Sequence, residues 1–473
     1  MDRKTVLEAS SEVGEEVKVS GWVHSRRDHG KLIFIDLRDR TGLMQVTFNP
    51  KENSETHKLA EKLRPEFVVS VTGLVKARPE KMVNDKLPTG KVELIAAELE
   101  IINESKTSPF EIDKDTIKVS EETRLEYRYL DMRSERMAKN LRTRHKIIKF
   151  IREYLDKRDF VDIQTPILSK STPEGARDYL VPSRLHPGKF FALPQSPQQY
   201  KQMLMVAGME RYYQIAPCFR DEDARADRSP GEFYQLDLEM SFVSQDDILQ
   251  MIEGLYTSLA KTLFPDKKIT SEPWPRLKYD DVMKEYGTDK PDLRKDKEDP
   301  NELAFAFIVD FPLFIPQTKE DFFHGAGEKF GPSHHMFTSP KESDIPLLDS
   351  EPLKVKSYQH DVVLNGFEVG GGSIRIHDPK IQEKIFDLIG FSAEQKVQFQ
   401  HLLKAFEYGV PPHGGIASGI DRLIMVLLGE PSLREVVAFP LTGDGRDPLT
   451  GAPSKVDPKQ LKDVHLKITD SKK

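Results

Sequence analysis

The chain contains almost no cysteine and no long apolar run, and these two absences narrow the class of protein. Its 473 residues include a single cysteine, Cys218, which excludes an internal disulfide and a cysteine-based zinc site and fits a reducing cytosol. The N-terminus lacks the apolar core of a signal peptide, and no apolar run approaches membrane-spanning length. We therefore expect a cytoplasmic, soluble protein with no membrane contact.

A strong excess of charge of either sign is also missing. The chain carries 70 basic and 77 acidic residues, a net charge of -7. This balance excludes a generally basic nucleic-acid coat but leaves room for a local basic patch. The length predicts roughly two to four domains.

Short alternating strands dominate the N-terminal part of the chain. Apolar and polar residues alternate over 17–24, 33–38 and 44–48, and further strands are predicted over 67–78 and 91–102. With a helix predicted over 54–63, these strands fit a small closed barrel of the oligonucleotide-binding type.

The alternation also predicts which side chains leave the barrel. With Ile33 and Ile35 inside, Phe34 faces outward, and so does Gln45. Such a surface suits a single-stranded nucleotide. The aromatic ring can stack on the base, the amide can bond to the base edge, and the basic loop 26–29 can neutralise the phosphate. The alternative is a lone surface phenylalanine, which is common.

Longer helices alternate with strands in the rest of the chain. Residues 106–123 are polar and non-periodic and predict a linker. After it we expect a helix ending near Asp156, strands over 160–168 and 190–193, a helix over 198–208 and a charged surface loop over 287–301.

A predicted hairpin carries the first group of charged residues. Its strands, up to Arg220 and from Glu232, place Gln235, Asp237 and Glu239 on one face and apolar residues on the other. Arg220 and Glu222 lie at the mouth of the loop. A solvated polar face explains this motif equally well when it is taken alone.

Two glycine-rich stretches carry the other charged groups. The strand 364–376 holds glycines between Glu368 and Arg375, and glycine is best tolerated where a ligand or another backbone comes close. The stretch 414–429 becomes an almost wholly apolar helix with Arg422 in its first turn, a position that suits a phosphate. The alternative for Arg422 is a structural bridge to a carboxylate such as Asp421.

These motifs together resemble a class II aminoacyl-tRNA synthetase, most closely a bacterial-type aspartyl-tRNA synthetase, over nearly the whole chain. The three class motifs are matched by 160–168, by Phe219-Arg-Asp-Glu222 with its following strand, and by Gly419-Ile-Asp-Arg422. Aspartate-specific stretches are matched at 171–179, 195–201 and 366–375. The resemblance implies an α+β protein with an OB-fold anticodon-binding barrel over 1–107, a linker over 108–133 and a class II catalytic domain over 134–473, an antiparallel sheet flanked by helices.

The activity implied by the resemblance is that of an aspartate–tRNA ligase. L-Aspartate would react with ATP to give aspartyl-adenylate and pyrophosphate, and aspartate would then pass to the 3′ end of tRNA(Asp). The attacking carboxylate is already ionised, so catalysis would come mainly from positioning and charge stabilisation. The resemblance also implies Mg²⁺ with ATP and a homodimer formed through the first motif.

The resemblance assigns roles to named positions. The catalytic residues would be Arg220, Glu222 and Arg422. Aspartate would be bound by Glu174, Gln198, Lys201, Arg220, Asp237, His334 and Arg375. ATP would be bound by Arg220, Asp221, Glu222, Glu368, Gly419, Ile420, Asp421 and Arg422. Mg²⁺ would be held by Asp361 and Glu368. The anticodon would meet Arg26, Phe34, Gln45, Arg78, Asn84 and Glu93.

The chain departs from the bacterial pattern at several points. The usual bacterial insertion domain is missing near 295–305, which leaves tRNA contacts in that region open. Ser229 replaces a usual ATP-contacting glutamine, with Gly231 inserted beside it, and Ser418 replaces a usual aromatic residue. His29 and Met82 stand where the family discriminates tRNA(Asp) from tRNA(Asn), and they favour a relaxed enzyme that also charges tRNA(Asn).

Two other interpretations remain. A related ligase for asparagine or lysine is opposed by Lys201 and Arg375, because neither amino acid would want two cations around its side chain. A non-catalytic RNA-binding relative is opposed by the presence of the charged residues expected of a working site, namely Arg220, Glu222, Glu368 and Arg422.

Overall fold

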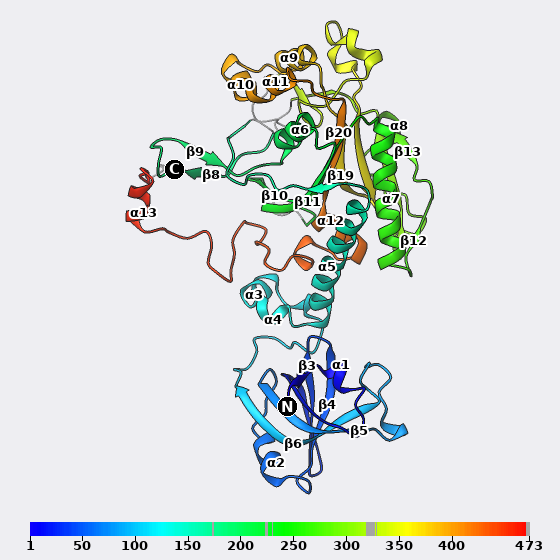
Figure 1. Ribbon diagram of the computed structural model, residues 1–473, viewed down its shortest axis with the longest axis vertical. Coiled ribbons are helices and arrows are strands. Elements are labelled where there is room, and N and C mark those ends of the chain that lie inside the picture. Colours follow the sequence, from blue (N-terminus) through cyan, green and yellow to red (C-terminus); the bar gives the residue numbers. More distant parts are fainter. Residues whose placement is uncertain (173–174, 223–225, 229, 318–326, 328, 470–473) are drawn as a thin grey trace. The chain divides into compact units, whose positions relative to one another are not determined.

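The computed structural model describes residues 1–172, 175–222, 226–228, 230–317, 327 and 329–469 (Figure 1). They form two compact units, Met1–Ala138 and Lys139–Lys473. The sequence predicted three segments, 1–107, 108–133 and 134–473. These limits are not tested by the division into two units and stay a prediction. Over the described part of the chain, no helix combines the length and apolarity needed to cross a bilayer.

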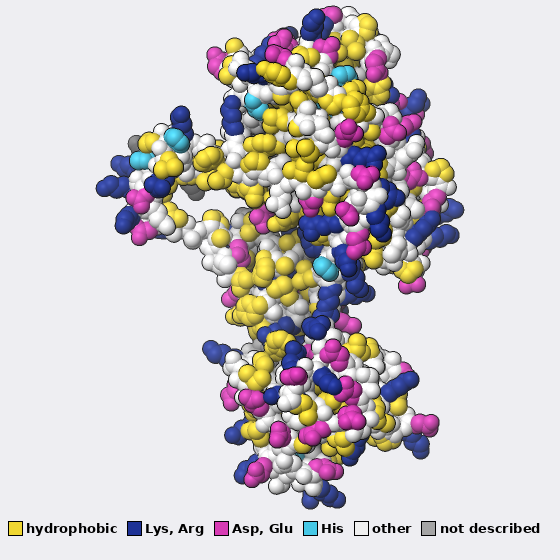
Figure 2. Space-filling view, in the orientation of Figure 1, with side chains coloured by type: hydrophobic (Ala, Val, Ile, Leu, Met, Phe, Trp, Pro, Cys, Tyr) yellow, Lys and Arg dark blue, Asp and Glu magenta, His cyan; other side chains and the backbone are white. Residues whose placement is uncertain are grey.

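The first unit is built on a closed barrel, as the alternation predicted. Its strands are β2 (Glu16–His29), β3 (Leu32–Asp39), β4 (Gly42–Phe48), β5 (Val68–Ala77) and β6 (Val92–Asn103), with the short β1 (Arg3–Lys4) beside β2. Pairing of β2 with β5 closes the barrel. Figure 2 shows acidic and basic side chains interspersed over the visible face of this unit.

Short helices lie between the barrel strands in the sequence and follow the last strand. They are α1 (Val6–Ala9), α2 (Ser54–Ala60), η1 (Glu80–Met82), η2 (Thr116–Lys118), α3 (Glu121–Glu126) and α4 (Arg128–Asp131). The last three lie in or next to the segment predicted as an irregular linker. They are held together by the buried Asp131, which accepts hydrogen bonds from Arg128 and Thr116, both at 2.5 Å. Contacts of this kind join short polar segments, so hydrophobic periodicity does not predict them.

The second unit is built on a mainly antiparallel sheet. Among the described residues, eight strands follow the order β13-β15-β18-β19-β20-β11-β10-β7. Their bounds are β13 (Arg276–Lys278), β15 (Phe305–Val309), β18 (Gln359–Leu364), β19 (Phe367–Ile374), β20 (His413–Gly419), β11 (Gly231–Ser241), β10 (Arg211–Arg220) and β7 (Val161–Asp162). Only the two edge pairings, β13 with β15 and β10 with β7, are parallel within this described sheet.

Smaller strand pairs and helices surround this sheet. The pairs are β8 (Leu180–Pro182) with β9 (Phe190–Ala192), β12 (Lys268–Ile269) with β14 (Glu302–Leu303), and β16 (Phe314–Pro316) with β17 (Phe330–Pro332). The helices are α5 (Glu135–Asp156), α6 (Gln198–Val206), α7 (Gln245–Leu263), α8 (Tyr279–Tyr286), α9 (Pro379–Leu388), α10 (Ala393–Gln398), α11 (Gln400–Phe406), α12 (Ile420–Leu428) and α13 (Pro458–Asp463), with short turns η3 (Glu342–Leu348), η4 (Pro352–Lys354) and η5 (Leu433–Glu435).

One face of the sheet is apolar and packs against helices. Leu236 and Leu238 of β11 join Ile151 of α5, Ile252 of α7 and Leu423 of α12 in a single buried cluster. This packing confirms that α12 is buried, and it leaves the opposite, polar face of β11 open to a ligand.

The strand predicted over 160–168 is wrong in length, because only Val161–Asp162 pair as β7. The backbone N–H of Ile163 still reaches Tyr213, but that of Thr165 turns to the side chain of Gln214, at 3.4 Å. Pro166 has no N–H to donate, so the ladder ends there.

The glycines of β19 let three strands approach closely. A Cβ on Gly372 would lie 2.2 Å from the carbonyl oxygen of Gly415, which belongs to the backbone of β20. A Cβ on Gly371 would instead project toward the carboxylate of Asp361, at 3.1 Å.

We therefore expect Gly372→Ala to destabilise the protein by about 2–3 kcal/mol, because the clash falls on backbone that cannot move without opening the sheet. Gly371→Ala is the matched control, with a smaller loss. Denaturant unfolding of both variants checks this, and equal losses would contradict the close approach at Gly372.

Candidate active site

The hairpin of β10 and β11 positions the polar face of the site. Its register pairs Gln214 with Asp237 and Arg220 with Gly231. Because side chains alternate along β11, Asp237 and Glu239 point away from the apolar cluster, as the sequence predicted.

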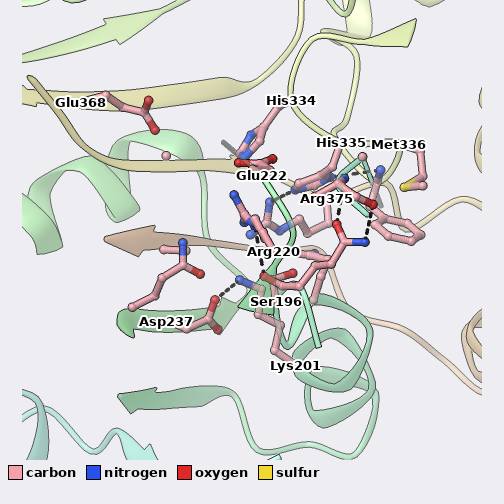
Figure 3. A pocket seen from close by; sticks show the side chains of 18 residues that line it. Ser196, Lys201, Arg220, Glu222, Asp237, His334, His335, Met336, Glu368 and Arg375 are labelled. Carbon is pink, nitrogen blue, oxygen red and sulfur yellow. Dashed lines mark hydrogen bonds and ion pairs between the residues drawn. The ribbon is translucent and has the colours of Figure 1, made fainter. Parts of the chain in front are cut away.

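Four charged side chains, Lys201, Asp237, Glu239 and Arg375, form a network on this face; Figure 3 labels all of them except Glu239. Lys201 of α6 lies 2.8 Å from Asp237 and 3.4 Å from Glu239. Arg375 binds Glu239 through two bonds, at 2.9 and 3.1 Å. All four are almost fully buried, so each charge depends on its partners for compensation.

The two carboxylates of the network differ in their surroundings. Burial raises the pKa of Asp237 despite the neighbouring Lys201. Burial would also raise the pKa of Glu239, but the charges of Arg375 and Lys201 lower it below its ordinary value. Among the described residues, Oδ1 of Asp237 has no hydrogen-bond partner, which leaves a buried acceptor for a ligand.

Two adjacent histidines line the same cavity. His335 bonds to Arg375 through Nε2, at 2.7 Å, and its ring lies 4.4 Å from that of His334. Burial and the charge of Arg375 lower the pKa of His334 to about 3, so the ring is neutral near pH 7. In the described part of the chain, Nδ1 of His334 has no partner.

Two cavities adjoin at Arg220. The first, of about 270 Å³, is lined by Gln198, Lys201, Asp237, His334 and Arg375, among others. The second, of about 180 Å³, is lined by Phe233, Gly419, Asp421 and Arg422, among others. Residues common to both are Arg220, Glu222, Gln235, Glu368 and Ala417.

Arg220 occupies the junction with its charge uncompensated. Its Nε lies 3.3 Å from the carbonyl oxygen of Gln195, and its guanidinium lies 5.1 Å from the centre of the Phe233 ring. No carboxylate within the described ranges forms an ion pair with it, whereas Glu222 pairs with Arg228 at 3.0 Å. An anion that reaches both cavities would meet Arg220.

Arg422 faces the second cavity at the start of α12. It donates to the carbonyl oxygens of Glu368, at 2.7 Å, and Asp227, at 3.1 Å. The neighbouring Asp421 pairs instead with Arg144. The structural bridge to a carboxylate that the sequence offered as an alternative is therefore present, but Arg422 pairs with Asp227, at 3.4 Å, and Glu368, at 3.9 Å, and not with Asp421.

The two carboxylates expected to hold a metal ion lie together. A Cβ on Gly371 would approach Asp361 at 3.1 Å and Glu368 at 3.6 Å. Burial, and then the charge of Glu368, raise the pKa of Asp361 well above its usual value. The described residues contain no cluster of three or more His, Cys, Asp or Glu that could hold a metal, so these two would need oxygens from a bound ligand.

Other predicted residues take different positions. Glu174 and Ser229 fall outside the described residues. Ile420 is buried in the apolar cluster, so its side chain does not face a ligand. Asp221 lies at the surface, 3.7 Å from Arg177.

The unusual Ser418 has no side-chain role in either cavity. It is fully buried and faces away from both, toward Gly370, where an added Cβ would lie 2.5 Å from its hydroxyl. The departure from the family pattern at this position therefore concerns packing.

The barrel brings together part of its predicted set. Phe34 and Gln45 are partly exposed on the outer face, and Gln45 donates to Glu93 at 3.0 Å. Arg78 bonds through Nε to Val92, and Asn84 accepts from the backbone of Lys86.

Arg26 is held differently from the other predicted barrel residues. It bonds to Asp28 and to the backbone carbonyls of Glu61 and Leu63. The guanidinium is thus already bound within the barrel.

The sequence interpretation missed two residues of the site. Glu239 was placed on the correct face but given no role, and His335 was not assigned. The signal for Glu239 was its alternation with Asp237, yet its partner Arg375 is distant in sequence and could not be identified from spacing.

Comparisons with known proteins identify the families of both parts of the chain. Residues 120–443 match the family model described as tRNA synthetases class II (D, K and N), and residues 17–102 match the OB-fold nucleic acid binding domain.

Curated relatives match over nearly the whole chain. The aspartate–tRNA(Asp/Asn) ligase of Dehalococcoides mccartyi (strain CBDB1) is 42% identical, over 97% of this chain and 98% of its own. The ligase of the same name from Rubrobacter xylanophilus is 43% identical, over 97% and 95%. The alignments span 594 and 583 positions, more than the 473 residues here, so the relatives carry residues that this chain lacks.

Solved structures share the fold at lower identity. The asparaginyl-tRNA synthetase of Pyrococcus horikoshii with asparaginyl-adenylate has a TM-score of 0.72 at 24% identity, over 90% of this chain and 95% of its own. The aspartyl tRNA synthetase from Entamoeba histolytica has a TM-score of 0.71 at 22% identity, over 93% and 91%.

The buried network predicts a large effect for Glu239→Gln. Removing this negative charge leaves Lys201 and Arg375 with one carboxylate between them, so we expect a loss of at least about 3 kcal/mol in unfolding free energy. Glu232→Gln, at the exposed end of the same strand, is the matched control and should change stability little. Denaturant unfolding of both proteins measures the difference, and a Glu239→Gln variant as stable as the control would refute the network's role.

Proposed function

The chain belongs to the class II tRNA synthetases of the D, K and N group, and from this premise we propose that it is an aspartate–tRNA ligase. It activates L-aspartate with ATP to aspartyl-adenylate and transfers aspartate to the 3′ end of tRNA(Asp). The family model covers three amino acids, so the choice among them depends on the pocket and on the curated relatives.

The charge balance of the first cavity is the observation that carries the proposal. Lys201, Arg220 and Arg375 converge on this cavity. Asp237 and Glu239 pair with Lys201 and Arg375, Glu222 pairs with Arg228 and Glu368 with Lys290, and Arg220 has no carboxylate partner in the described ranges. Free aspartate carries one net negative charge, asparagine none, and lysine one net positive charge. Only aspartate brings a second carboxylate to these cations, whereas the asparagine amide and the lysine ammonium bring none and would forgo the charge-assisted bonds.

The unsatisfied atoms of the cavity suit the same ligand. The free Oδ1 of Asp237 can accept a bond from the substrate ammonium, with Gln198 beside it. Lys201 and Arg375 can hold the side-chain carboxylate, and the neutral His334 can donate to it from a ring nitrogen. Glu174 stays a predicted ligand of the ammonium.

The position of Arg220 supports an in-line transfer between the two cavities. An oxygen of the aspartate α-carboxylate attacks the α-phosphorus of ATP, the bond to the β-phosphate oxygen breaks, and pyrophosphate leaves. Arg220 lies where both the carboxylate and the α-phosphate would be, so it can align them and offset the charge that develops between them. In the second step the terminal ribose hydroxyl of tRNA attacks the carbonyl carbon, and AMP leaves.

The second cavity supplies the nucleotide contacts. Glu222 would hold the adenine end, the backbone of Gly419 and Ile420 and the side chains of Asp221 and Asp421 would complete the predicted nucleotide set, and Arg422 would meet the γ-phosphate. Asp361 and Glu368 would hold Mg²⁺ brought with ATP, since their carboxylates lie together and burial with the charge of Glu368 raises the pKa of Asp361. When bound, Mg²⁺ supplies positive charge to the phosphate oxygens.

The tRNA would bind the outer face of the barrel at Phe34 and Gln45. Met82 is well exposed there, with 59% of its surface accessible, and His29 is also exposed. Together with the names of the curated relatives, these residues support charging of both tRNA(Asp) and tRNA(Asn).

A homodimer is supported by the edge of the catalytic sheet. Strand β7 ends the sheet, and the exposed apolar residues Val161, Ile167 and Leu168 lie in or just after it. An exposed apolar edge of this kind favours a partner copy. The residues that the relatives have in excess would correspond to the insertion domain missing near 295–305.

The first test is ATP–pyrophosphate exchange with each amino acid. We expect exchange with aspartate and none with asparagine or lysine, because only aspartate brings a side-chain carboxylate to Lys201 and Arg375. Arg220→Ala should abolish the exchange while leaving tRNA binding largely intact. Absence of exchange with aspartate in the unmodified protein would overturn the proposed function.

A second test separates the barrel from the catalytic unit. Phe34→Ala removes the proposed stacking surface, so charging of tRNA should fall by roughly tenfold or more, while ATP–pyrophosphate exchange stays unchanged. Aminoacylation of purified tRNA(Asp) and tRNA(Asn) side by side measures the effect and the range of acceptors. A fall in exchange would show that the barrel assignment is wrong.

A further inference from the structure

A lysine with no role in the proposed function lies beside the carboxylates expected to hold Mg²⁺. Nζ of Lys290 is 3.4 Å from Oε2 of Glu368. It belongs to the segment 287–301, which the sequence predicted only as a charged surface loop. Its side chain is 42% exposed, so it lies at the rim of the site and not in the core.

The loop that carries Lys290 is firmly anchored. It begins at Gly287, which ends α8 with a positive φ of 69°. Asp292 and Arg294 pair at 2.7 Å, and the carboxylate of Glu302 accepts the backbone N–H groups of Lys295 and Asp296, at 3.1 and 3.2 Å. These contacts hold the loop in one conformation.

The anchor also fixes the loop to the hairpin that carries both metal-site carboxylates. Gly366 forms the turn between β18, with Asp361, and β19, with Glu368. An added Cβ on Gly366 would lie 3.4 Å from Cβ of Asp292, so the loop packs directly on this turn. The short distance from Lys290 to Glu368 therefore follows from packing of the loop.

Two cations share one carboxylate at this position. Oε2 of Glu368 lies 3.4 Å from Lys290 and 3.9 Å from Arg422. Arg422 and Glu368 both line the second cavity. An exposed lysine–glutamate pair contributes little to stability, so the pair offers little resistance to a ligand that draws Glu368 away.

We propose that Lys290 binds the phosphates of the nucleotide, pairing its ammonium with the β- or γ-phosphate oxygens that become the pyrophosphate leaving group. The inference rests on the proposed function, which supplies ATP as the ligand. With ATP bound, Lys290 would exchange the carboxylate oxygen of Glu368 for a phosphate oxygen, and Glu368 would be one of the residues that hold Mg²⁺.

The chemistry of a lysine suits this position. Its ammonium is a compact charge on a flexible stem, so it can follow an anion that moves, whereas a planar guanidinium favours a fixed bidentate geometry. Negative charge grows on the pyrophosphate as its bond to the α-phosphorus breaks, and a charge at the rim stabilises it there. Lys290 neither gives nor takes a proton in this step.

The test compares Lys290→Met, which keeps a side chain of similar length and removes the charge, with Lys297→Met, an exposed control in the same loop. Exchange kinetics give KM for ATP, pyrophosphate and aspartate. Calorimetric titration of ATP and of pyrophosphate, each with Mg²⁺, gives Kd without any reaction. We expect KM and Kd for ATP and pyrophosphate to rise roughly tenfold in the Lys290→Met variant, as for loss of one charged hydrogen bond, with KM for aspartate unchanged.

Three results would contradict the inference. Unchanged Kd for both ATP and pyrophosphate in Lys290→Met would overturn it. A lower Mg²⁺ requirement with unchanged nucleotide binding would show that Lys290 only neutralises Glu368. Lys290→Arg, which restores a positive charge, should recover most of the binding, and an Arg variant as weak as the Met variant would point to a structural role.

The test also distinguishes failure of the inference from failure of the proposed function. If the unmodified protein showed no exchange with aspartate, the function would fall. The calorimetric comparison of ATP binding would still decide the role of Lys290.

Discussion

The structure of the site depends on a buried network of ion pairs among Lys201, Arg375, Asp237 and Glu239. Four ionised groups almost without solvent are stable only if every charge has a partner at close range, and the distances of 2.8 to 3.4 Å meet that condition. The groups come from α6, β11 and the end of β19, so the network can form only when the whole catalytic sheet is assembled. The first cavity is therefore complete only in the assembled sheet.

The glycines of β19 and β20 complete this constraint from the backbone side. Close packing at Gly372 holds β19 against β20, where Gly415 pairs with both Ser373 of β19 and Glu239 of β11. Arg375, two residues after Ser373, reaches Glu239 from there. The same lack of side chains leaves the sheet surface flat at Gly371, between the charge network and the carboxylates Asp361 and Glu368. A ligand in the first cavity therefore meets backbone, and no side chain, at Gly371.

Local sequence patterns predicted which way strand side chains point. They did not predict the partners of those side chains, because the partners are distant in the sequence. Period-two alternation correctly placed Phe34 outside the barrel and Asp237 opposite the apolar cluster, because the direction of a strand side chain is set by its immediate neighbours. The partners of these groups were not local. The alternative for Arg422 was a bridge to a carboxylate such as the adjacent Asp421, yet consecutive helix residues point in different directions. Asp421 meets Arg144, and Arg422 meets Asp227 and Glu368. The roles of individual residues came from the family resemblance, which carries information that one sequence's periodicity does not hold.

The cations of the proposed site differ in exposure, and the difference matches the fate of the groups they would bind. Lys201 and Arg375 have side chains only 2% and 1% exposed, and they would hold the aspartate carboxylate that remains through both steps. Arg422 is 20% exposed and Lys290 42%, and both would face phosphates that leave as pyrophosphate. A rigid, desolvated cation gives selectivity because it cannot adapt to a neutral ligand, whereas a hydrated cation releases an anion readily. The composition of a charged loop such as 287–301 does not show which of its lysines reaches the site. The contacts of Asp292 and Glu302 fix the loop, and they determine that Lys290 does so.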